Sequence, residues 1–519
     1  MADITKTYLA PREKDPVKQN SVLRQVLEYE ANLMAGGTTA AGQMAGGTGA
    51  TSSTFWRGDG TWAAPPAAMT VVNVVTYGAL GDFNNNFSTG SDDTSAIQAA
   101  INAAAAISGP MRSGAITYLP AGTYRISAPL TIPGDMQFIG AGRVSTVIIN
   151  SCTTTDVIQV TGSSTTIADM TLYGTGVSTV TGASVPTAGW AIDITSGGNN
   201  SKFKDLTIGR TFNGINVGSS ASNGEIEFVY MFDIYGQYMI NGAPGWTIQD
   251  NQLDMTFYGG IYGSTAQFEA HQNSTSYSNG DVSWSNGGYY FCNGSGTSAS
   301  SGHPSPAMFN TSITDGTASW TYICATNLVK INLAAGSATV KSNDLSGPSR
   351  YGIVVNSGNN TISGNYFSQI IGIGLQIKNG NTGNTVTYNQ FSQTFASSTD
   401  VVGSAIGNHI NAVAGNTIVS GNVFNESSGI SISWANSTDF GINNNEFIPP
   451  YGTPNLKSAV QLVSCSRFNV AFNNIPKATS TGSIVVVTPT GNDYNIIGNT
   501  CGGTSVSNAS GFGNVVYNT

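Results

Sequence analysis

The 519-residue chain contains little charge. Only 9% of its residues are Asp, Glu, Lys or Arg, against roughly 25% in an ordinary globular domain. Low charge can accompany disorder, but the hydrophobic share is 40% and the Ile, Val and Phe residues are regularly spaced, so we expect a folded protein. The net charge of -9 argues against a nucleic acid partner, because nucleic acids bind basic surfaces.

Cysteine, histidine and long apolar runs are scarce as well. The five cysteines include no Cys-x-x-Cys pair, so neither a disulfide framework nor a zinc site is indicated. The three histidines lack metal-ligand spacing, and we predict no metal and no cofactor. No apolar run is long enough to span a membrane, and the N-terminus has no apolar signal core. We therefore expect no membrane insertion and a product released by cell lysis.

Residues 1–35 are expected to form a separate helical piece. Asp15 and Pro16 suit a helix start, and Gly36 and Gly37 suit its end. The apolar residues between them recur at helical spacing; they are Val22, Leu23, Val26, Leu27, Leu33 and Met34. So short a helix is not stable alone in water, and its apolar stripe must pack on something. Self-association and docking on another protein are equally compatible with the pattern.

Residues 36–69 are expected to be a flexible linker, because Gly, Ala and Thr dominate its first part. The segment from Phe55 to Trp62 reads Phe-Trp-Arg-Gly-Asp-Gly-Thr-Trp. This resembles a short motif found in many phage tail-fibre proteins ahead of the distal domain. The embedded Arg57-Gly58-Asp59 is expected to form a turn between aromatic anchors and not an integrin ligand.

Residues 70–150 carry five short motifs in a fixed order. They are Tyr77-Gly78-Ala79, Gly81-Asp82, Asp92-Asp93-Thr94, Leu119-Pro120-Ala121-Gly122-Thr123-Tyr124 and Phe138-Ile139-Gly140-Ala141-Gly142. Their order and spacing resemble the start of the pectate-lyase-like β-helix superfamily. The first coil of a β-helix has an apolar end, and the Ala-rich helix expected after Thr94 can cover it. Asp92 and Asp93 are then expected to be cap and turn residues and not catalysts.

Residues 151–519 are expected to form the coils of a right-handed parallel β-helix. An aliphatic residue, two others, Asn, one other and an apolar residue recur eight times. The asparagines are Asn251, Asn343, Asn365, Asn389, Asn422, Asn445, Asn473 and Asn499. From Asn343 onward, successive asparagines are 22–33 residues apart, and a repeat of this length indicates a solenoid. The apolar positions are expected to face inward, and each Asn to occupy a turn, where it can bond backbone, adopt a left-handed conformation and bond the next Asn along the axis.

The interval between Asn251 and Asn343 is longer than one coil. Residues 280–326 within it are expected to form a small inserted β module. Their run from Asp315-Gly316-Thr317 to Trp320-x-Tyr322 resembles a module that recurs in phage tail and carbohydrate-binding proteins. The fold class predicted for the whole chain is thus all-β: a right-handed parallel β-helix with a short N-terminal helix and this insertion.

No catalytic triad, phosphate-binding loop or metal-binding motif is visible in the sequence. Paired carboxylates therefore remain as the candidate catalytic groups. Glycan hydrolysis needs such a pair. Residues 203–281 hold eight acids and residues 328–519 only six, and the first stretch is also rich in aromatic residues. The candidates for acid, base or nucleophile are Glu225, Glu227, Asp250, Asp254 and Glu269. The candidates for stacking on sugar are Trp246, Tyr258 and Trp284.

The alternative is a structural role, in which these aromatic residues fill the core and the acids keep the surface soluble. Trp246 in particular could equally belong to the core. Alternation supports this reading in part, because Phe228, Tyr230 and Phe232 share one face of a strand, while Glu225 and Glu227 share the other.

The resemblances imply the spike or fibre subunit of a bacteriophage tail. Spikes of this type are usually homotrimers that bind, and often cleave, bacterial surface polysaccharide. Residues 1–65 would attach the protein to other tail or baseplate proteins on the virion, which is extracellular after host lysis. Because the β-helix superfamily includes lyases, hydrolases and inert adhesins, enzymatic activity stays open. The alternatives are a receptor-binding tail fibre without activity and a free secreted polysaccharide lyase or hydrolase.

Overall fold

The computed structural model describes most of the chain from residue 70 onward. The described residues are 54–56, 62–63, 70–83, 89–107, 115–175, 185–218, 220–242, 244–255, 268–307, 311–394, 410–427, 430–448, 458–475, 484–487, 493–501, 506–508 and 514–518. The chain divides into two compact units, Met1–Met69 and Thr70–Thr519. Within the described ranges no helix has the length and apolar character needed to cross a membrane.

The first unit contains one described strand pair. Strands β1 (Phe55–Trp56) and β2 (Trp62–Ala63) run antiparallel, with Trp56 opposite Trp62. The Arg57-Gly58-Asp59 sequence lies outside the described residues, so the turn expected there stays a prediction. The helix expected in residues 1–35 and most of the expected linker lie outside the described residues.

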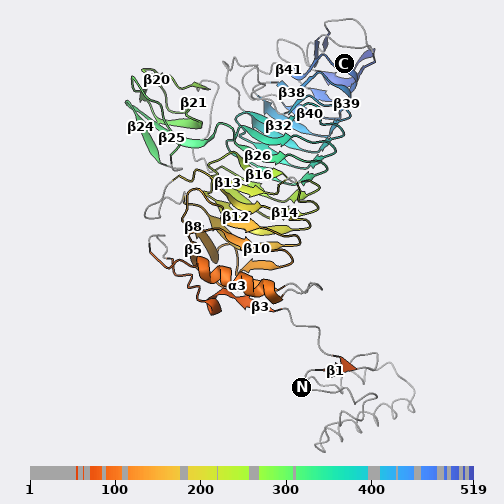
Figure 1. Ribbon diagram of the computed structural model, residues 1–519. Helices are drawn as coiled ribbons and strands as arrows, with labels where there is room; N and C mark the ends of the chain where they lie inside the picture. Colours follow the sequence, from red (N-terminus) through yellow and green to blue (C-terminus); the bar gives the residue numbers. More distant parts are fainter. Residues whose placement is uncertain are drawn as a thin grey trace, which may run out of the picture. The chain divides into compact units, whose positions relative to one another are not determined.

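The second unit is a right-handed parallel β-helix, as the repeat predicts (Figure 1). Most of the described coils contribute a strand to each of three parallel sheets. The first sheet contains β3 (Val71–Asn73), β4 (Ile116–Leu119), β7 (Gln137–Gly140), β10 (Thr166–Tyr173), β12 (Lys202–Gly209), β14 (Glu225–Glu227), β17 (Thr247–Gln249), β27 (Thr339–Lys341), β30 (Thr361–Ser363), β33 (Thr385–Thr387), β36 (Ile418–Ser420), β39 (Thr438–Asn443), β42 (Ser466–Ala471), β45 (Asn495–Cys501) and β47 (Asn514–Asn518).

The second sheet follows the first around a tight corner, and long strands such as β10 and β12 run through both. Its other strands are β5 (Gly122–Ile126), β8 (Thr146–Asn150), β15 (Tyr230–Phe232), β18 (Gln252–Leu253), β28 (Asp344–Leu345), β31 (Tyr366–Ser368), β34 (Gln390–Thr394), β37 (Val423–Ser427), β40 (Glu446–Ile448) and β43 (Asn474–Ile475).

The third sheet has 13 strands and closes each coil. They are β6 (Leu130–Ile132), β9 (Ile158–Val160), β11 (Trp190–Ile194), β13 (Asn213–Asn216), β16 (Tyr238–Gly242), β26 (Val329–Leu333), β29 (Tyr351–Val355), β32 (Ile373–Ile377), β35 (Ile410–Ala412), β38 (Ile430–Ala435), β41 (Ser458–Val463), β44 (Ile484–Val487) and β46 (Val506–Asn508).

A helix covers the N-terminal end of the coils, next to the short 3-10 helix η2 (Val74–Tyr77). Helix α3 (Thr94–Ile107) buries its apolar stripe, which includes Ile97 and Ile101, against the first coil. Asp92 accepts a hydrogen bond from the Thr94 amide at 3.0 Å, as a capping residue does. The buried Asp93 accepts one from the Leu80 amide at 2.7 Å, and burial raises its pKa. Both acids thus have the structural roles expected of them.

The recurring asparagines form a buried ladder at the corner between the first and second sheets. From Asn251 to Asn499, each side-chain amide donates to the Oδ1 atom of the next asparagine at 2.8–3.0 Å. The predicted stacking along the axis is confirmed. The expected left-handed conformation is wrong by one position, because it belongs to the residue before each asparagine, such as Asp250, Ser342 and Tyr388.

Aromatic rings stack inside the coils in a similar way. Phe367, Phe391, Phe424 and Phe447 form one column, with ring centroids 4.4, 5.1 and 4.9 Å apart. These rings occupy the apolar position that follows each asparagine by two residues. The inward orientation predicted for the repeat is therefore confirmed.

The β module is inserted between Leu253, where β18 ends, and Val329, where β26 begins. Its sheet has the order β19 (Phe268–Ala270), β21 (Val282–Ser285), β22 (Gly288–Gly294), β25 (Ala318–Ala325) and β24 (Ser312–Asp315). A second pair joins β20 (Ser276–Tyr277) to β23 (Gly296–Thr297). The module's strands thus begin before residue 280. The Tyr322 hydroxyl donates to the Tyr235 carbonyl at 3.5 Å, which fixes the module to the β-helix.

Candidate functional site

The predicted site residues fall into separate environments. Six of the eight have described side chains: Glu225, Glu227, Trp246, Asp250, Asp254 and Trp284. Glu269 lies in β19, but its side chain is outside the described set, and Tyr258 is outside the described residues altogether. The described acids lie on a band of neighbouring coils that crosses the first sheet, the corner and the second sheet.

Glu225 and Glu227 point outward from β14 on the first sheet. The side-chain amide of Gln249, on the next strand, donates to Glu225 Oε1 at 3.3 Å and to Glu227 Oε2 at 3.2 Å. The two accepting oxygens are therefore at most 6.5 Å apart, which is 3.3 Å plus 3.2 Å. Lys202 Nζ bonds Glu225 Oε2 at 2.9 Å, and this bond raises the pKa of Lys202. The cluster can bond sugar hydroxyls and brings two carboxylates within catalytic range.

Asp254 lies where the second sheet gives way to the inserted module. Burial raises the pKa of its carboxyl group; Lys330 opposes this rise and Asp344 adds to it. Asp344 lies on β28, where it pairs with Gln252 of β18. The Ser346 hydroxyl donates to Asp344 Oδ1. Two carboxylates thus lie on neighbouring coils at the base of the module, offset by two positions in a register that pairs Gln252 with Asp344.

Lys330 lies beneath these two acids and is fully buried. Its Nζ atom donates to the Leu253 carbonyl at 2.7 Å and also to the Ser346 carbonyl. Burial lowers the pKa of Lys330 to about 8, although Asp254 and Asp344 act to raise it. The Lys330 ammonium thus links β18, which leads into the module, to the segment that follows β28 on the next coil. Its positive charge interacts with the carboxylates of Asp254 and Asp344.

Asp250 occupies the corner between the two clusters. Asp250 is exposed and precedes the buried Asn251. Its backbone has the left-handed conformation, with φ of 54°. Its backbone amide donates to the Lys341 carbonyl at 3.3 Å. Asp250 therefore belongs to the same outer band as the paired acids, as a surface charge on the corner.

The predicted stacking role of Trp246 is wrong. Its side chain is fully buried, its ring packs on Phe203 with centroids 5.6 Å apart, and Nε1 donates to the Ala221 carbonyl at 3.2 Å. An indole whose faces are covered inside the coil cannot stack on a ligand. Trp284 lies in the module, is partly buried and contacts Tyr289 edge to face at 6.2 Å.

Sequence reasoning missed Asp344, Lys330 and Gln249. Asp344 follows directly after the repeat asparagine Asn343, so the repeat itself placed it at the start of a second-sheet strand. Lys330 is a lysine inside an apolar strand, Val-Lys-Ile-Asn-Leu, and a charged residue in such a run is itself a signal.

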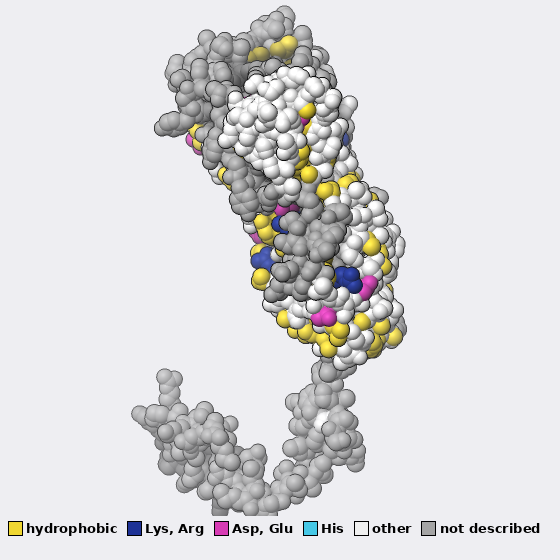
Figure 2. Space-filling view, turned by 90° about the vertical axis from the view of Figure 1, so that its left-hand side faces the viewer, with side chains coloured by type: hydrophobic (Ala, Val, Ile, Leu, Met, Phe, Trp, Pro, Cys, Tyr) yellow, Lys and Arg dark blue, Asp and Glu magenta, His cyan; other side chains and the backbone are white. Residues whose placement is uncertain are grey.

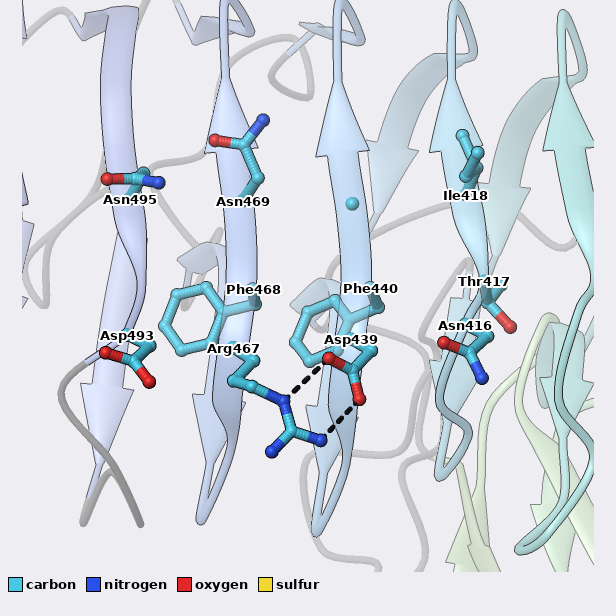
Figure 3. Close-up of a pocket in the computed structure, with 11 residues that line it drawn as sticks. Asn416, Thr417, Ile418, Asp439, Phe440, Arg467, Phe468, Asn469, Asp493 and Asn495 are labelled. Carbon is cyan, nitrogen blue, oxygen red and sulfur yellow. Dashed lines mark hydrogen bonds and ion pairs between the residues drawn. The ribbon is translucent and has the colours of Figure 1, made fainter.

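A shallow hollow of about 610 Å³ lies farther along the first sheet, across β36, β39, β42 and β45. Figure 3 shows Asp439 and Arg467 facing each other at its edge, where Nε–Oδ1 and Nη2–Oδ2 are 2.7 and 2.6 Å. The bonds from Arg467 and Thr438 lower the pKa of Asp439 to about 2. In the outward row Gly441 stands between Ile418 and Asn469. The hollow can accept a small polar group but is several coils from the acids.

The described surface carries few charges, as Figure 2 shows for one face, where uncharged polar side chains and backbone predominate. Within the described ranges, no three or more His, Cys, Asp or Glu residues are arranged to hold a metal ion. The band around Glu225, Asp254 and Asp344 is thus a local concentration of acids on an otherwise weakly charged surface.

Comparison with known proteins identifies the fold. Residues 71–294 match the family model described as rhamnogalacturonase A/epimerase, pectate lyase-like. The mannuronan C5-epimerase AlgE3 of Azotobacter vinelandii is 46% identical over 83 residues, which are 15% of this chain and 4% of the epimerase. The epimerase AlgE2 of the same organism gives the same identity over 7% of its length. The chain therefore spans only a small part of these curated relatives.

Solved structures share the architecture at low sequence identity. The DFA-IIIase of Arthrobacter chlorophenolicus A6, solved in complex with DFA-III, has a TM-score of 0.50 and 12% identity, over 83% of this chain and 95% of that one. The A-module of the A. vinelandii epimerase AlgE6 has a TM-score of 0.48 and 16% identity, over 86% and 97%. The comparisons thus show the β-helix fold, and residues 71–294 are similar to a pectate-lyase-like family.

Proposed function

We propose that the protein is the spike or fibre subunit of a bacteriophage tail, and that it binds and cleaves a bacterial surface polysaccharide. The observation that carries the enzymatic part is the pair formed by Asp254 and Asp344. Asp254 has a raised pKa, and the second carboxylate, Asp344, lies on the next coil at the base of the inserted module and adds to that rise. Glycan hydrolysis requires two carboxyl groups with different protonation states.

Asp254 is the proton donor of the pair. Because burial raises its pKa, it keeps its proton to a higher pH than an exposed aspartic acid and can protonate the glycosidic oxygen as the bond breaks. Asp344 is the second carboxylate: it accepts a proton from the attacking water or attacks the sugar itself. Lys330 holds the backbone on both sides of the pair in place.

Several observations support a polysaccharide as the ligand. The outer surface is rich in hydroxyl and amide groups, which suit sugar hydroxyls, and Glu225, Glu227 and Gln249 form a hydrogen-bonded cluster beside the proposed acids. The family model and the epimerases that the chain resembles are named for action on polysaccharides.

The tail role rests on the N-terminal unit. The segment from Phe55 to Trp62 resembles a tail-fibre motif, and its ends pair as antiparallel strands. We propose that residues 1–65 attach the protein to other tail or baseplate proteins and that the subunit is a homotrimer. Light scattering on the purified chain should give three times the monomer mass. Deleting residues 1–65 should leave a folded trimer that no longer joins tails; incorporation of the truncated protein into virions contradicts the attachment.

The enzymatic proposal is tested by incubating the full-length protein with capsule or lipopolysaccharide from candidate hosts and measuring the release of new reducing ends. Changing Asp254 or Asp344 to Asn should lower the rate at least about 100-fold, the usual scale for acid–base catalysis. The matched control is Asp493→Asn, because Asp493 is an exposed acid that precedes β45, several coils beyond the pair and away from the corner between the first and second sheets. It should keep the wild-type rate.

The outcomes separate the functions that the fold allows. Full activity in both Asp variants places the chemistry elsewhere, and Glu227→Gln then tests the pair on the first sheet. Binding without any chain shortening by the wild-type protein supports the receptor-binding fibre without activity. A monomer that cleaves polysaccharide supports the free enzyme.

A further inference from the structure

Three aromatic rings project from the corner between the first and second sheets. They are Phe228, Tyr388 and Phe472, and 48%, 76% and 63% of their surfaces are exposed. Tyr388 and Phe472 directly precede an asparagine of the buried ladder, and Phe228 occupies the same corner position one coil before the ladder begins. At other coils this row holds small or polar residues: Asp169, Asp205, Asp250, Ser342, Gly364, Gly421, Asn444 and Gly498.

The backbone makes these rings unexpected. Phe228, Tyr388 and Phe472 have φ of 54°, 57° and 56°, in the left-handed region. Bulky side chains are rare there, whereas Gly and Asn enter it readily. An exposed ring gains little from burial, so folding alone gives no reason for aromatic residues at these positions. Strain of this kind is typical of sites where function requires a particular side chain.

The surroundings of Tyr388 keep its ring accessible. The neighbouring coils place Gly364 and Gly421 on its two sides. A Cβ atom on Gly421 would come within 2.8 Å of the Tyr388 ring, so the ring lies across this glycine. Its outer face meets solvent, with the hydroxyl groups of Ser363, Thr387 and Ser420 in the adjoining row. An aromatic face bordered by hydroxyl groups suits a sugar ring.

The spacing of the rings favours an extended ligand over a protein interface. Coils repeat about every 4.8 Å, so Tyr388 and Phe472, three coils apart in the ladder, are separated by roughly 14 Å. Gly421 and Asn444 fill the interval, so the two rings are separate contacts along the row and do not form one continuous apolar patch. One coil advances by about the length of one sugar residue, so a polysaccharide running along the axis could meet the rings in turn.

We propose that this corner row is the track on which the polysaccharide lies, parallel to the β-helix axis. Sugar C–H faces stack on Phe228, Tyr388 and Phe472, and the side chains on both sides bond hydroxyl groups. The row contains three Asp and no Lys or Arg. The cations that border it are Arg143, which donates to the Phe228 carbonyl at 3.3 Å, and Lys204 and Lys341 on the first sheet. Because the acids of the row and of the neighbouring band outnumber these cations, the track favours an uncharged polysaccharide over a polymer of uronic acids. Asp254 and Asp344 belong to coils between Phe228 and Tyr388, which places cleavage within the track. This inference rests on the proposed function.

The test measures binding of a neutral host polysaccharide by calorimetry in the Asp254→Asn background, where the ligand stays intact. Tyr388→Asn and Phe472→Asn remove a ring and keep a residue that tolerates φ near +57°. Each should weaken binding about tenfold, the double variant should weaken it further, and Tyr388→Phe should bind as wild type does. Tyr77→Asn, at an exposed tyrosine of the N-terminal cap, is the control and should have no effect.

The results distinguish failure of the track from failure of the proposed function. Ring variants that bind as tightly as the parent overturn the track and leave the proposed function standing. A parent protein that binds no bacterial polysaccharide overturns the proposed function. Loss of the oligomer in Tyr388→Asn, measured by light scattering, identifies the ring as a subunit contact and overturns the track. Tighter binding of uronic acid polymers than of neutral chains contradicts the substrate class.

Discussion

The asparagine ladder should stabilise the coils strongly, and Asn389 in its middle is the residue to change. Its Oδ1 atom accepts from the Asn365 backbone amide at 3.0 Å and from the Asn365 side-chain amide at 2.9 Å. Its own amide donates to the Ile362 carbonyl and to Asn422 Oδ1, both at 3.0 Å. Replacement by Ala removes these bonds and leaves their partners buried.

The size of the effect follows from these contacts. Each intramolecular hydrogen bond contributes about 1 kcal/mol net, and a buried polar group left without a partner costs about 1–3 kcal/mol. We therefore expect Asn389→Ala to lower the unfolding free energy by about 4 kcal/mol, well above the effect of an average substitution of about 1 kcal/mol. The control is Asn474→Ala, because Asn474 is an exposed asparagine on β43, next to the ladder.

Urea unfolding followed by circular dichroism measures both variants at equal protein concentration. Asn389→Asp adds a second check, because a buried carboxylate cannot donate to Ile362 or Asn422. Its destabilisation should be large at pH 7 and smaller at pH 4, where the new acid takes up a proton. A difference below about 1 kcal/mol between Asn389→Ala and Asn474→Ala would refute the reasoning, because the ladder would then contribute little.

Two further predictions concern charged groups. Burial lowers the pKa of Lys330 to about 8 in the folded protein, from 10.5, so between these values the unfolded chain holds more protons and stability rises with pH. From pH 7.5 to 9.5, the unfolding free energy of wild type should rise by about 2 kcal/mol relative to Lys330→Met; parallel curves contradict the burial of a charged amine. Arg467→Met removes the exposed ion pair with Asp439 and should leave the melting temperature unchanged, since exposed pairs contribute little; a clear drop contradicts this.

The coils can be predicted well from the sequence because the same pattern of apolar residues and asparagine recurs in successive coils. The repeat around each asparagine fixes which apolar residues face inward, and the motifs before residue 150 locate the covering helix. The left-handed position was misplaced by one residue, since the chain holds Asp250, Ser342 and Tyr388 there and no single residue type marks it. The side chain at this position points away from the core, so the hydrophobic pattern of the sequence does not reveal the position either.

The site could be predicted only in part. A local excess of acids indicated Glu225, Glu227 and Asp254, which share one band of the surface. Asp344 escaped because it is far from Asp254 in sequence, and only the register between β18 and β28 across the inserted module brings the two together. Composition also could not separate the buried Trp246 from exposed rings, because facing direction depends on the path of the coil.

The most direct test of the proposed function is a structure of the Asp254→Asn protein with an oligosaccharide prepared from a polysaccharide that the wild-type protein shortens. We predict that a sugar residue lies between the substituted side chain at position 254 and Asp344, with the glycosidic oxygen within hydrogen-bonding distance of that side chain. Neighbouring sugars should continue along the corner toward Tyr388. An oligosaccharide bound elsewhere, for example in the hollow beside Arg467, with position 254 and Asp344 free of sugar, would contradict the account.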